Sequence, residues 1–237
     1  MRRWKQISRP VISEQLEKHG FAMVPGVLPP ETVDDLVVSI EHALKNRWGH
    51  SGHALRHLLQ AVPAVQQVAD SATVRALVEP LIGPDAFVAR SLFFDKTPDV
   101  NWKVAWHQDL TITVRDKIEI PGFSGWSVKD GVVHVQPPPD VLNQMLTVRL
   151  HLDDCGSANG PLQVIPGSHK SGRLKPREIS EWRERVPATI CVVPRGGALL
   201  MRPFLLHASS SATEPGHRRV IHLEFGAKSL RGNLRWL

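Results

Sequence analysis

The stretch Trp106-His107-Gln108-Asp109-Leu110 decides the fold prediction, because it places a histidine and a carboxylate two residues apart. Side chains two apart on a β-strand point to the same face, so His107 and Asp109 can reach one metal ion while Gln108 points away. Two histidines and one carboxylate form the open-faced ligand set of non-haem Fe(II) oxygenases. The pair therefore needs one further histidine from another strand.

His207 is the predicted third ligand. It ends the apolar run 199–207, which is typical of one buried strand that finishes at a polar position. A His-x-Asp triplet occurs readily by chance in a chain with 12 histidines, so the order of all three ligands carries the prediction. His107, Asp109 and His207 would leave three coordination positions open for a co-substrate and dioxygen.

Arg218 follows His207 by eleven residues and makes the predicted site more specific. Turn-forming residues at 211–216 precede an alternating segment at 220–225, so we expect a hairpin. In that hairpin His222 would face His207, and Arg218 would lie four residues farther along, or roughly 13 Å of strand.

This separation suits a metal-chelating 2-oxo acid whose far carboxylate is held by the guanidinium of Arg218. Ser209 would donate its hydroxyl to the same carboxylate, or serve only as a turn hydroxyl. A register slip of one residue would turn Arg218 to the other face, and Arg218 and neighbouring Arg219 are equally suited to a place on the surface.

Several segments of the chain, which occur in the same order as in the family, resemble the phytanoyl-CoA dioxygenase family over about residues 10–236. These segments are Glu17–Leu28, Trp106–Leu110, Asn159–Lys170, and His207–Ser209 followed by Arg218-Arg219. The resemblance implies a mainly β fold with flanking helices and a double-stranded β-helix core of the jelly-roll, cupin-like kind. It also implies Fe(II) as cofactor and 2-oxoglutarate as co-substrate.

The resemblance assigns roles to individual residues. It implies that His107, Asp109 and His207 are the iron ligands and that Arg218 anchors 2-oxoglutarate. Arg149 occupies a position where relatives place a residue near the co-substrate, often an aromatic one, so the arginine departs from the pattern.

We therefore predict a dioxygenase that hydroxylates an unactivated C–H bond of a small-molecule substrate, with succinate and CO2 as co-products. Asp109 favours hydroxylation over halogenation, because a halide would need the coordination position that this carboxylate occupies. Two alternatives stay open. One is a metal-dependent barrel enzyme that does not use 2-oxoglutarate and does not need Arg218, and the other is a non-catalytic ligand-binding barrel.

The pattern along the chain predicts one domain over residues 1–237, without repeats or linkers. Its N-terminal part, about 10–82, is helical in pattern, and a β-helix core follows over about 86–230. We expect helices at Val11–His19, from Pro30 to about Trp48, and at roughly Val62–Leu81. Expected strands include Ala86–Phe94, Met145–Leu152 and Thr189–Val193.

The segment 111–144 interrupts the strand pattern and is longer than an ordinary connection. Long loops beside a site are often lids or binding loops, so we predict that Trp126, His134 and Gln136 contribute to substrate recognition. The alternative is an ordered surface loop in which Trp126 only fills the core.

The composition predicts a cytoplasmic protein that is not attached to a membrane. The chain has 2 cysteines without metal-ligand spacing, and its basic start, Arg2–Lys5, lacks the apolar stretch of a secretory signal. The net charge of +6 comes from scattered residues, which disfavours a nucleic-acid partner. A solvated basic surface, or attraction of an anionic substrate, explains the charge instead.

Overall fold

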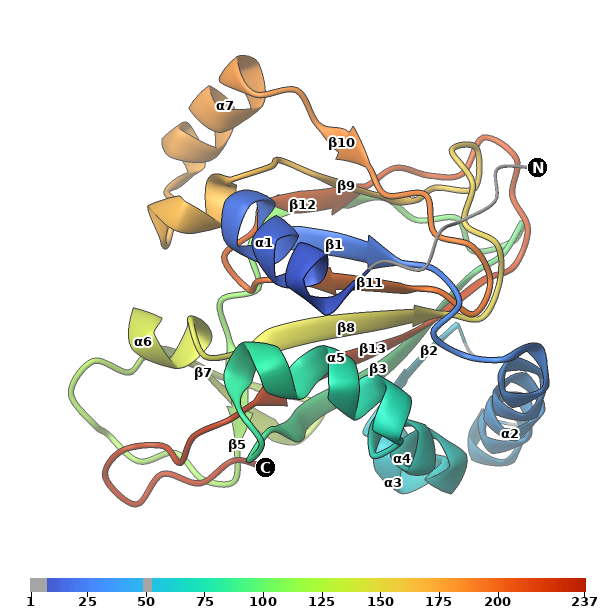
Figure 1. The fold of residues 1–237 in the computed structure, drawn as a ribbon. Helices are drawn as coiled ribbons and strands as arrows, with labels where there is room; N and C mark the ends of the chain where they lie inside the picture. The colour runs from blue at the N-terminus through green and yellow to red at the C-terminus, as the bar shows by residue number, and fades with distance from the viewer. Residues whose placement is uncertain (1–7, 49–52) are drawn as a thin grey trace.

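Two antiparallel β-sheets face each other in the structure (Figure 1). The computed structural model describes residues 8–48 and 53–237. The larger sheet has the order β1-β11-β8-β13-β3-β2, and the smaller one has the order β10-β9-β12-β4. The strands of the larger sheet are β1 (Phe21–Val24), β2 (Ala54–Arg56), β3 (Phe87–Lys96), β8 (Leu146–His151), β11 (Ala198–Met201) and β13 (Arg218–Gly226). Those of the smaller sheet are β4 (Val104–His107), β9 (Leu162–Val164), β10 (Thr189–Ile190) and β12 (His207–Ser209).

Around β13, the larger sheet has an apolar outer face and a mainly polar inner face. On β13, the odd-numbered residues 221, 223 and 225 belong to a buried apolar cluster. The even-numbered positions carry Arg218, His222 and Glu224, which are also buried. Because side chains alternate along a strand, these three polar groups share the inner face, toward the smaller sheet.

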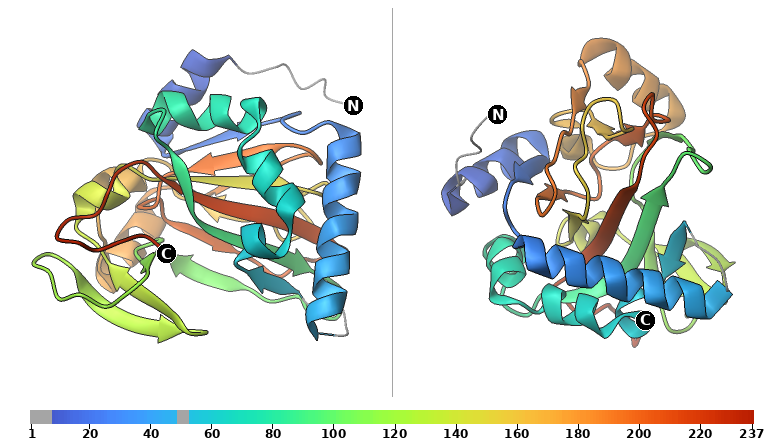
Figure 2. Two further views of the ribbon diagram at one scale, coloured as in Figure 1. Left: turned by 90° about the horizontal axis from the view of Figure 1, so that it is seen from below. Right: turned by 90° about the vertical axis from the view of Figure 1, so that its right-hand side faces the viewer.

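Helices from the N-terminal part cover the outer face of the larger sheet (Figure 2). They are α1 (Arg9–His19), α2 (Pro30–Trp48), α3 (Leu58–Ala61), α4 (Pro63–Ala69) and α5 (Ala72–Ile82), while α6 (Pro139–Leu142), the 3-10 helix η1 (Ser168–Ser171) and α7 (Pro176–Arg185) come later. The first two helices confirm the sequence prediction. The single helix expected at Val62–Leu81 is wrong, because Ser71 starts α5 by accepting a hydrogen bond from the Val74 amide at 3.4 Å.

The run 199–207 forms two strands in different sheets, so the prediction of one strand is wrong. β11 ends at Met201, and β12 begins at His207. The intervening segment turns, with the Leu205 amide donating to the Arg202 carbonyl at 3.0 Å, and Pro203 has no amide for a sheet bond. This turn carries the chain from the larger sheet to the smaller one.

The predicted hairpin between β12 and β13 is also wrong. β12 pairs with β4 and β9, whereas β13 pairs with β3 and β8. The connection is held elsewhere: Asn101 Nδ2 donates to the Ala212 carbonyl at 2.9 Å, and Asn101 Oδ1 accepts from the Ala212 amide at 2.7 Å. Residues 207 and 218 therefore lie on opposing sheets.

Segment 111–144 is not a long loop, which corrects the lid-like prediction. It forms a third antiparallel sheet of order β5-β7-β6, made of β5 (Ile112–Val114), β6 (Ser124–Lys129) and β7 (Val132–Gln136). Asp130 and Gly131 connect β6 to β7 with φ values of 51° and 77°. Positive φ at both turn residues is typical of a two-residue hairpin, which an Asp-Gly pair favours.

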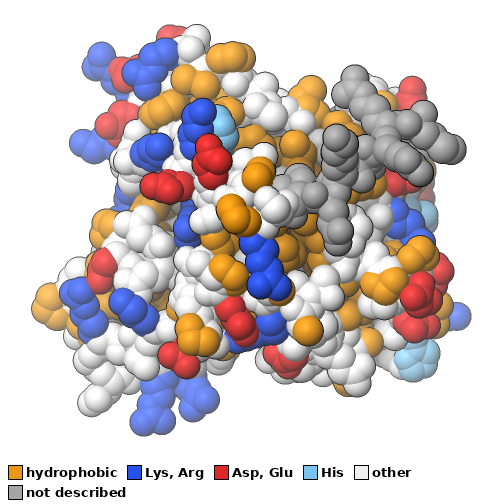
Figure 3. Space-filling model, in the orientation of Figure 1, with side chains coloured by type: hydrophobic (Ala, Val, Ile, Leu, Met, Phe, Trp, Pro, Cys, Tyr) orange, Lys and Arg blue, Asp and Glu red, His pale blue; other side chains and the backbone are white. Residues whose placement is uncertain are grey.

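Charged side chains of both signs are mixed on the face shown in Figure 3. On that face, Lys and Arg do not gather into one continuous tract. Within the described ranges, no helix combines the length and the apolar character needed to cross a membrane. The basic start, Arg2–Lys5, and the rest of 1–7 and 49–52 in the predicted domain lie outside the described residues.

Candidate active site

His107, Asp109 and His207 come together where β4 and β12 lie side by side. His107 is the last residue of β4, Asp109 lies two residues beyond it, and His207 is the first residue of β12. His107 and His207 are register partners, with ring centroids 4.2 Å apart. The possible ligand atoms of the three residues lie within 4.8 Å of one another.

Backbone carbonyls orient both imidazole rings. Nδ1 of His107 lies 2.8 Å from the Ala105 carbonyl, and Nδ1 of His207 lies 2.9 Å from the Leu205 carbonyl. Each Nδ1 therefore carries the proton, which leaves the Nε2 lone pair free to bind a metal. The two Nε2 atoms lie 3.7 Å and 3.6 Å from the carboxylate oxygens of Asp109.

The charge states of this cluster suit a divalent cation. Burial lowers the pKa of His207 to about 4, so its imidazole is neutral at pH 7. Burial alone would raise the pKa of Asp109, but the neighbouring histidines outweigh it and hold that pKa below the usual value. Asp109 Oδ2 is buried without a hydrogen-bond partner among the described residues. Two imidazole nitrogens and one carboxylate with this unpartnered oxygen are a donor set that fits an Fe(II) ion.

Gln108 fixes the metal-binding segment to its surroundings. Its side chain is buried and points away from the two ligands, as the sequence predicts. Gln108 Nε2 donates to the carbonyls of Phe204 at 2.6 Å and Gly172 at 2.7 Å, and Oε1 accepts from the Leu174 amide at 2.8 Å. The Phe204 contact ties the His107 segment to the turn that precedes His207.

The cluster opens into a cavity of about 230 Å³ between the two sheets. One water needs roughly 10–15 Å³ of such volume, so the cavity is many times larger than a site for a single water. This is enough for a small organic acid and part of a second molecule. Besides the cluster, its lining comprises Arg90, Leu92, Phe94, Trp102, Val104, Arg149, Leu162, Ser209, Arg218, His222 and Glu224.

Three buried cations lie in or beside this cavity. Arg218 is 4% exposed, Arg149 7% and Lys96 1%. Within the part of the chain that the structure describes, none of the three forms an ion pair with a carboxylate. Burial and the nearby Arg218 lower the pKa of Lys96 to about 8 and that of Arg149 to about 10. An unpaired buried charge is destabilising, so this arrangement favours an anionic ligand.

Ser209 and Arg218 line one end of the cavity, and buried Lys96 lies beside Ser209 just behind that lining. Lys96 and Arg218 are register partners on β3 and β13. Lys96 Nζ donates to Ser209 Oγ at 2.7 Å, and Arg218 Nη1 donates to the Gly160 carbonyl. Arg218 Nε is buried and unpartnered among the described residues. Donors are thus available for a ligand oxygen.

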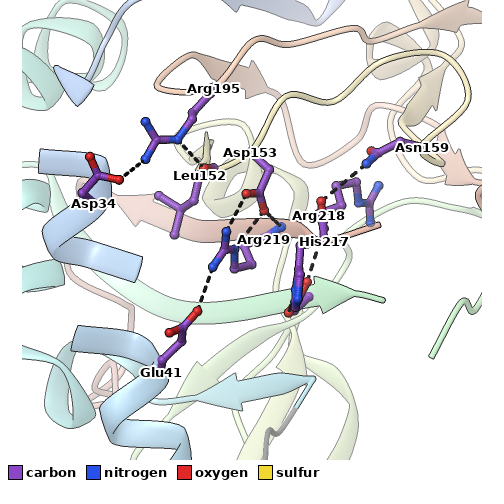
Figure 4. A network of polar contacts seen from close by, with 10 residues as sticks. Asp34, Glu41, Leu152, Asp153, Asn159, Arg195, His217, Arg218 and Arg219 are labelled. Carbon is purple, nitrogen blue, oxygen red and sulfur yellow. Dashed lines mark hydrogen bonds and ion pairs between the residues drawn. The ribbon is translucent and has the colours of Figure 1, made fainter. Parts of the chain in front are cut away.

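Arg219 points toward Asp153 and Glu41 (Figure 4) and is not among the residues that line this cavity. Its guanidinium pairs with Asp153 at 2.7 Å and with Glu41 of α2 at 2.8 Å. Arg218 lies on the opposite face of β13, since consecutive side chains alternate. Of the two arginines that the sequence offers, the geometry therefore favours Arg218 for the anion.

A hydrogen-bonded chain of side chains crosses the inner face of β8, β13 and β3. Arg149 Nη1 donates to His222 Nδ1 at 2.7 Å, and His222 Nε2 lies 3.2 Å from Glu224 Oε1. Arg90 Nη1 donates to the same Glu224 oxygen at 3.2 Å. Arg149 is thereby held in the cavity, with its guanidinium carbon over the ring of Phe94 and 5.9 Å from its centroid.

The three predicted substrate residues lie in different places. His134 lines a second, smaller cavity that adjoins the first. Trp126 packs against an apolar cluster that includes Phe123, and the Gln136 side chain lies against Gly125. The structure places Trp126 and Gln136 apart from the described lining of both cavities.

The sequence analysis did not single out Lys96, Arg90 or Glu224. Arg90 and Lys96 share one face of β3 with Leu92, because all three have even numbers. Glu224 shares its face of β13 with Arg218 in the same way. The sequence signal that could have identified these three residues is the recurrence of charged residues on one face of a buried strand.

The family model for phytanoyl-CoA dioxygenase matches residues 16–220 of this chain. L-proline trans-4-hydroxylase of Streptomyces griseoviridis is 27% identical over 175 residues, which cover 63% of this chain and 58% of that protein. The peroxisomal phytanoyl-CoA dioxygenase of Mus musculus is 27% identical over 169 residues, covering 63% and 42%. The chain thus spans about half the length of these curated relatives.

Solved structures share the fold at lower sequence identity. EctD from S. alaskensis, crystallised with 2-oxoglutarate and 5-hydroxyectoine, has a TM-score of 0.72 at 18% identity, covering 94% of this chain and 78% of that one. HygX from Streptomyces hygroscopicus, with nickel and 2-oxoglutarate bound, has a TM-score of 0.69 at 18% identity, covering 94% and 88%. The predicted β-helix core with flanking helices is confirmed.

Proposed function

The chain belongs to the phytanoyl-CoA dioxygenase family, and from that premise we propose that it is an Fe(II)- and 2-oxoglutarate-dependent dioxygenase. It hydroxylates an unactivated C–H bond of a small-molecule substrate. One atom of dioxygen enters the alcohol and the other enters succinate, which forms from 2-oxoglutarate with loss of CO2.

One observation carries the proposal: a His-Asp-His cluster and buried cations without carboxylate partners share one cavity. The cluster of His107, Asp109 and His207 supplies three ligands and leaves positions open. The cations favour a ligand that brings negative charge. A 2-oxo dicarboxylate satisfies both requirements, because one end can chelate a metal while the other meets Arg218.

The chain's residues have separate tasks in this proposal. His107, Asp109 and His207 hold the iron, which supplies dioxygen activation and C–H cleavage when bound. Arg218 and Lys96 hold the distal carboxylate of 2-oxoglutarate, and Ser209 donates its hydroxyl to it. The rings of Phe94 and Trp102, with other apolar side chains of the cavity, exclude water from the reacting groups.

The hydrogen bond from Arg149 to His222 fixes the Arg149 side chain in the cavity, where we place it next to the co-substrate. Its guanidinium stays charged at neutral pH, and Nε is buried and unpartnered among the described residues. Arg149 therefore offers a donor to the co-substrate or to the substrate, where the family pattern often has an aromatic residue.

The proposal includes an anionic substrate and a cytoplasmic location. The first is supported by Arg149, which lines the cavity and has no carboxylate partner among the described residues. The second is supported by Cys155 and Cys191, which are buried free thiols.

The test is co-substrate turnover by matched arginine variants. Fe(II)-loaded protein is screened with a library of small carboxylated and phosphorylated substrates, and succinate release is measured. Arg218→Ala should raise the KM for 2-oxoglutarate strongly, whereas Arg219→Ala should leave it near the wild-type value. Turnover that survives Arg218→Ala would favour a metal enzyme that does not use 2-oxoglutarate, and absence of succinate with every substrate would favour a non-catalytic barrel.

A further inference from the structure

A second cavity, of about 50 Å³, adjoins the first and is rich in basic side chains. Its polar lining includes Arg56, His57, Arg90, Lys129 and His134. Among the described residues that line it, none is Asp or Glu. Arg90 and Leu92 of β3 line both cavities, so the two spaces meet at this strand.

Separate elements bring these side chains together. Arg56 lies on β2, which pairs with β3 so that Arg56 is opposite Leu92. Lys129 ends β6, and His134 lies on β7. The third sheet is fastened to β3 by Thr113, whose Oγ1 donates to the Ala89 carbonyl at 3.2 Å.

His134 offers a buried polar group to this cavity. Its side chain is 3% exposed, and its Nδ1 is bonded to the Val132 carbonyl at 3.0 Å. No other hydrogen bond of the ring is found within the described residues, so Nε2 is available to a ligand. Burial lowers the pKa of His134, and the positive charges of Arg90, Lys129 and Arg56 lower it further.

The positive charge of the cavity is only partly balanced. Arg90 shares Glu224 with His222, at 3.2 Å. Arg56 pairs with Asp130 at 2.7 Å, but the two side chains are 44% and 69% exposed, so solvent screens this pair. Lys129 has no carboxylate partner among the residues described. Leu237, the last residue of the sequence, lines the same cavity. Lys129 and Nε2 of His134 are therefore the groups, among the residues described, that have no partner and could meet a ligand oxyanion.

We propose that the second cavity binds an anionic group of the substrate, of phosphate or carboxylate size, while the carbon to be hydroxylated lies in the first cavity. This assignment of substrate class rests on the proposed function. The volume is several times the roughly 10–15 Å³ that a single water needs, so the cavity has room for a group larger than one water. Arg90, at the junction, would face both parts of the substrate.

The test uses inorganic phosphate and acetate as probes of the full-length chain, by calorimetric titration with and without 2-oxoglutarate. The site variant is Arg56→Gln/Lys129→Gln. The matched control is Arg177→Gln/Lys117→Gln, which makes the same charge change at exposed, ion-paired residues that line neither cavity. Circular dichroism and thermal unfolding verify that both variants are folded.

With saturating 2-oxoglutarate in the first cavity, we expect saturable binding of one phosphate or one acetate per chain. The better of the two probes identifies the group. The site variant should weaken this binding by about tenfold or more, which corresponds to about 1.4 kcal/mol, and the control should change it less than about twofold. Affinity for 2-oxoglutarate should be the same in both variants.

Absence of saturable binding by both probes would overturn the proposal, as would equal weakening in the control. Loss of all probe binding when saturating 2-oxoglutarate is present would also overturn it, because the probe would then bind only in the first cavity. The proposed function fails differently: 2-oxoglutarate would not bind the iron-loaded chain, while the phosphate and acetate titrations would still report on the second cavity.

Discussion

Lys96 and Arg218 face each other as direct cross-strand partners on β3 and β13, and both side chains are buried. Like charges in this position destabilise a sheet. Lys96 Nζ nevertheless points to Ser209, and Arg218 points to the carbonyl of Gly160. We interpret the pair as a two-sided grip, meaning that Lys96 and Arg218 both bind the same ligand carboxylate. The negative charge of that carboxylate would compensate the repulsion between the two cations.

Lys96→Met should weaken 2-oxoglutarate binding by roughly 10- to 100-fold, because a charge-assisted hydrogen bond contributes about 1.5–3 kcal/mol. The same change should raise the thermal unfolding temperature of the ligand-free protein, since it removes a buried cation beside Arg218. Titration and thermal unfolding check both effects, with Lys45→Met on the exposed side of α2 as control. Unchanged 2-oxoglutarate affinity in Lys96→Met would contradict the two-sided grip.

The affinity for 2-oxoglutarate should fall as pH rises through about 8, where buried Lys96 loses its proton. Burial and Arg218 lower the pKa of Lys96 from 10.5, so the unfolded chain binds more protons than the folded one between pH 8 and 10.5. The penalty for burying charged Lys96 is thus fully present below pH 8 and fades as pH rises toward 10.5. Affinities measured from pH 7 to 9.5 should show this fall in the wild type and not in Lys96→Met. The same slope in both proteins would assign the titration to another group.

Gln108→Leu should destabilise the fold and weaken metal binding together. The substitution removes the side-chain bonds to Phe204, Gly172 and Leu174, which leaves buried backbone groups without partners. Each such group costs about 1–3 kcal/mol, so the free energy of unfolding should fall by at least about 2 kcal/mol. Denaturant unfolding and Fe(II) titration measure the two effects. Gln66→Leu, at an exposed position of α4, is the control. Equal losses of stability and of Fe(II) affinity in both variants would show that the hydrogen bonds of Gln108 do not position the metal-binding segment.

The sequence predicted that His107, Asp109 and His207 share one site, and the structure brings their possible ligand atoms within 4.8 Å of one another. Two of the three are local to each other, while His207 was found from the order of the motifs. His107 and Asp109 are two residues apart, and the apolar run before His207 marks a buried segment. Arg218 also lines the cavity beside these residues. Its side chain enters the cavity from the opposite sheet and not from a hairpin with the His207 strand. The prediction of its position rested on the wrong pairing of strands.

Strand pairing was harder to predict because it depends on distant contacts. Asn101 holds the backbone of Ala212, over 100 residues away, and so draws the chain after β12 away from a hairpin. Lys96 could not be recognised as a candidate site residue from its local sequence, because it lies next to Arg218 only through strand pairing across more than 100 residues. By contrast, the Asp130-Gly131 pair was a local turn pattern that could have revealed the third sheet.

Trp126 should act through packing rather than through substrate contact. Its indole lies against the apolar cluster of the third sheet, so Trp126→Ala should lower the free energy of unfolding by roughly 1–3 kcal/mol. The affinity of the second cavity for phosphate or acetate should stay within about twofold of wild type. His134→Ala should do the opposite, with little loss of stability and weaker anion binding. Unfolding curves and the same titrations distinguish a packing role from a binding role. Weaker anion binding in a folded Trp126→Ala variant would support the original prediction that Trp126 contributes to substrate recognition.

The most direct test of the central claim is an anaerobic titration of the protein with Fe(II) and then with 2-oxoglutarate, followed by visible absorption and calorimetry. We predict one Fe(II) and one 2-oxoglutarate per chain, with a charge-transfer band that requires both. His207→Ala should lose the iron, and Arg218→Ala should retain iron but bind 2-oxoglutarate much more weakly. An iron-loaded wild-type protein that binds no 2-oxoglutarate would contradict the account.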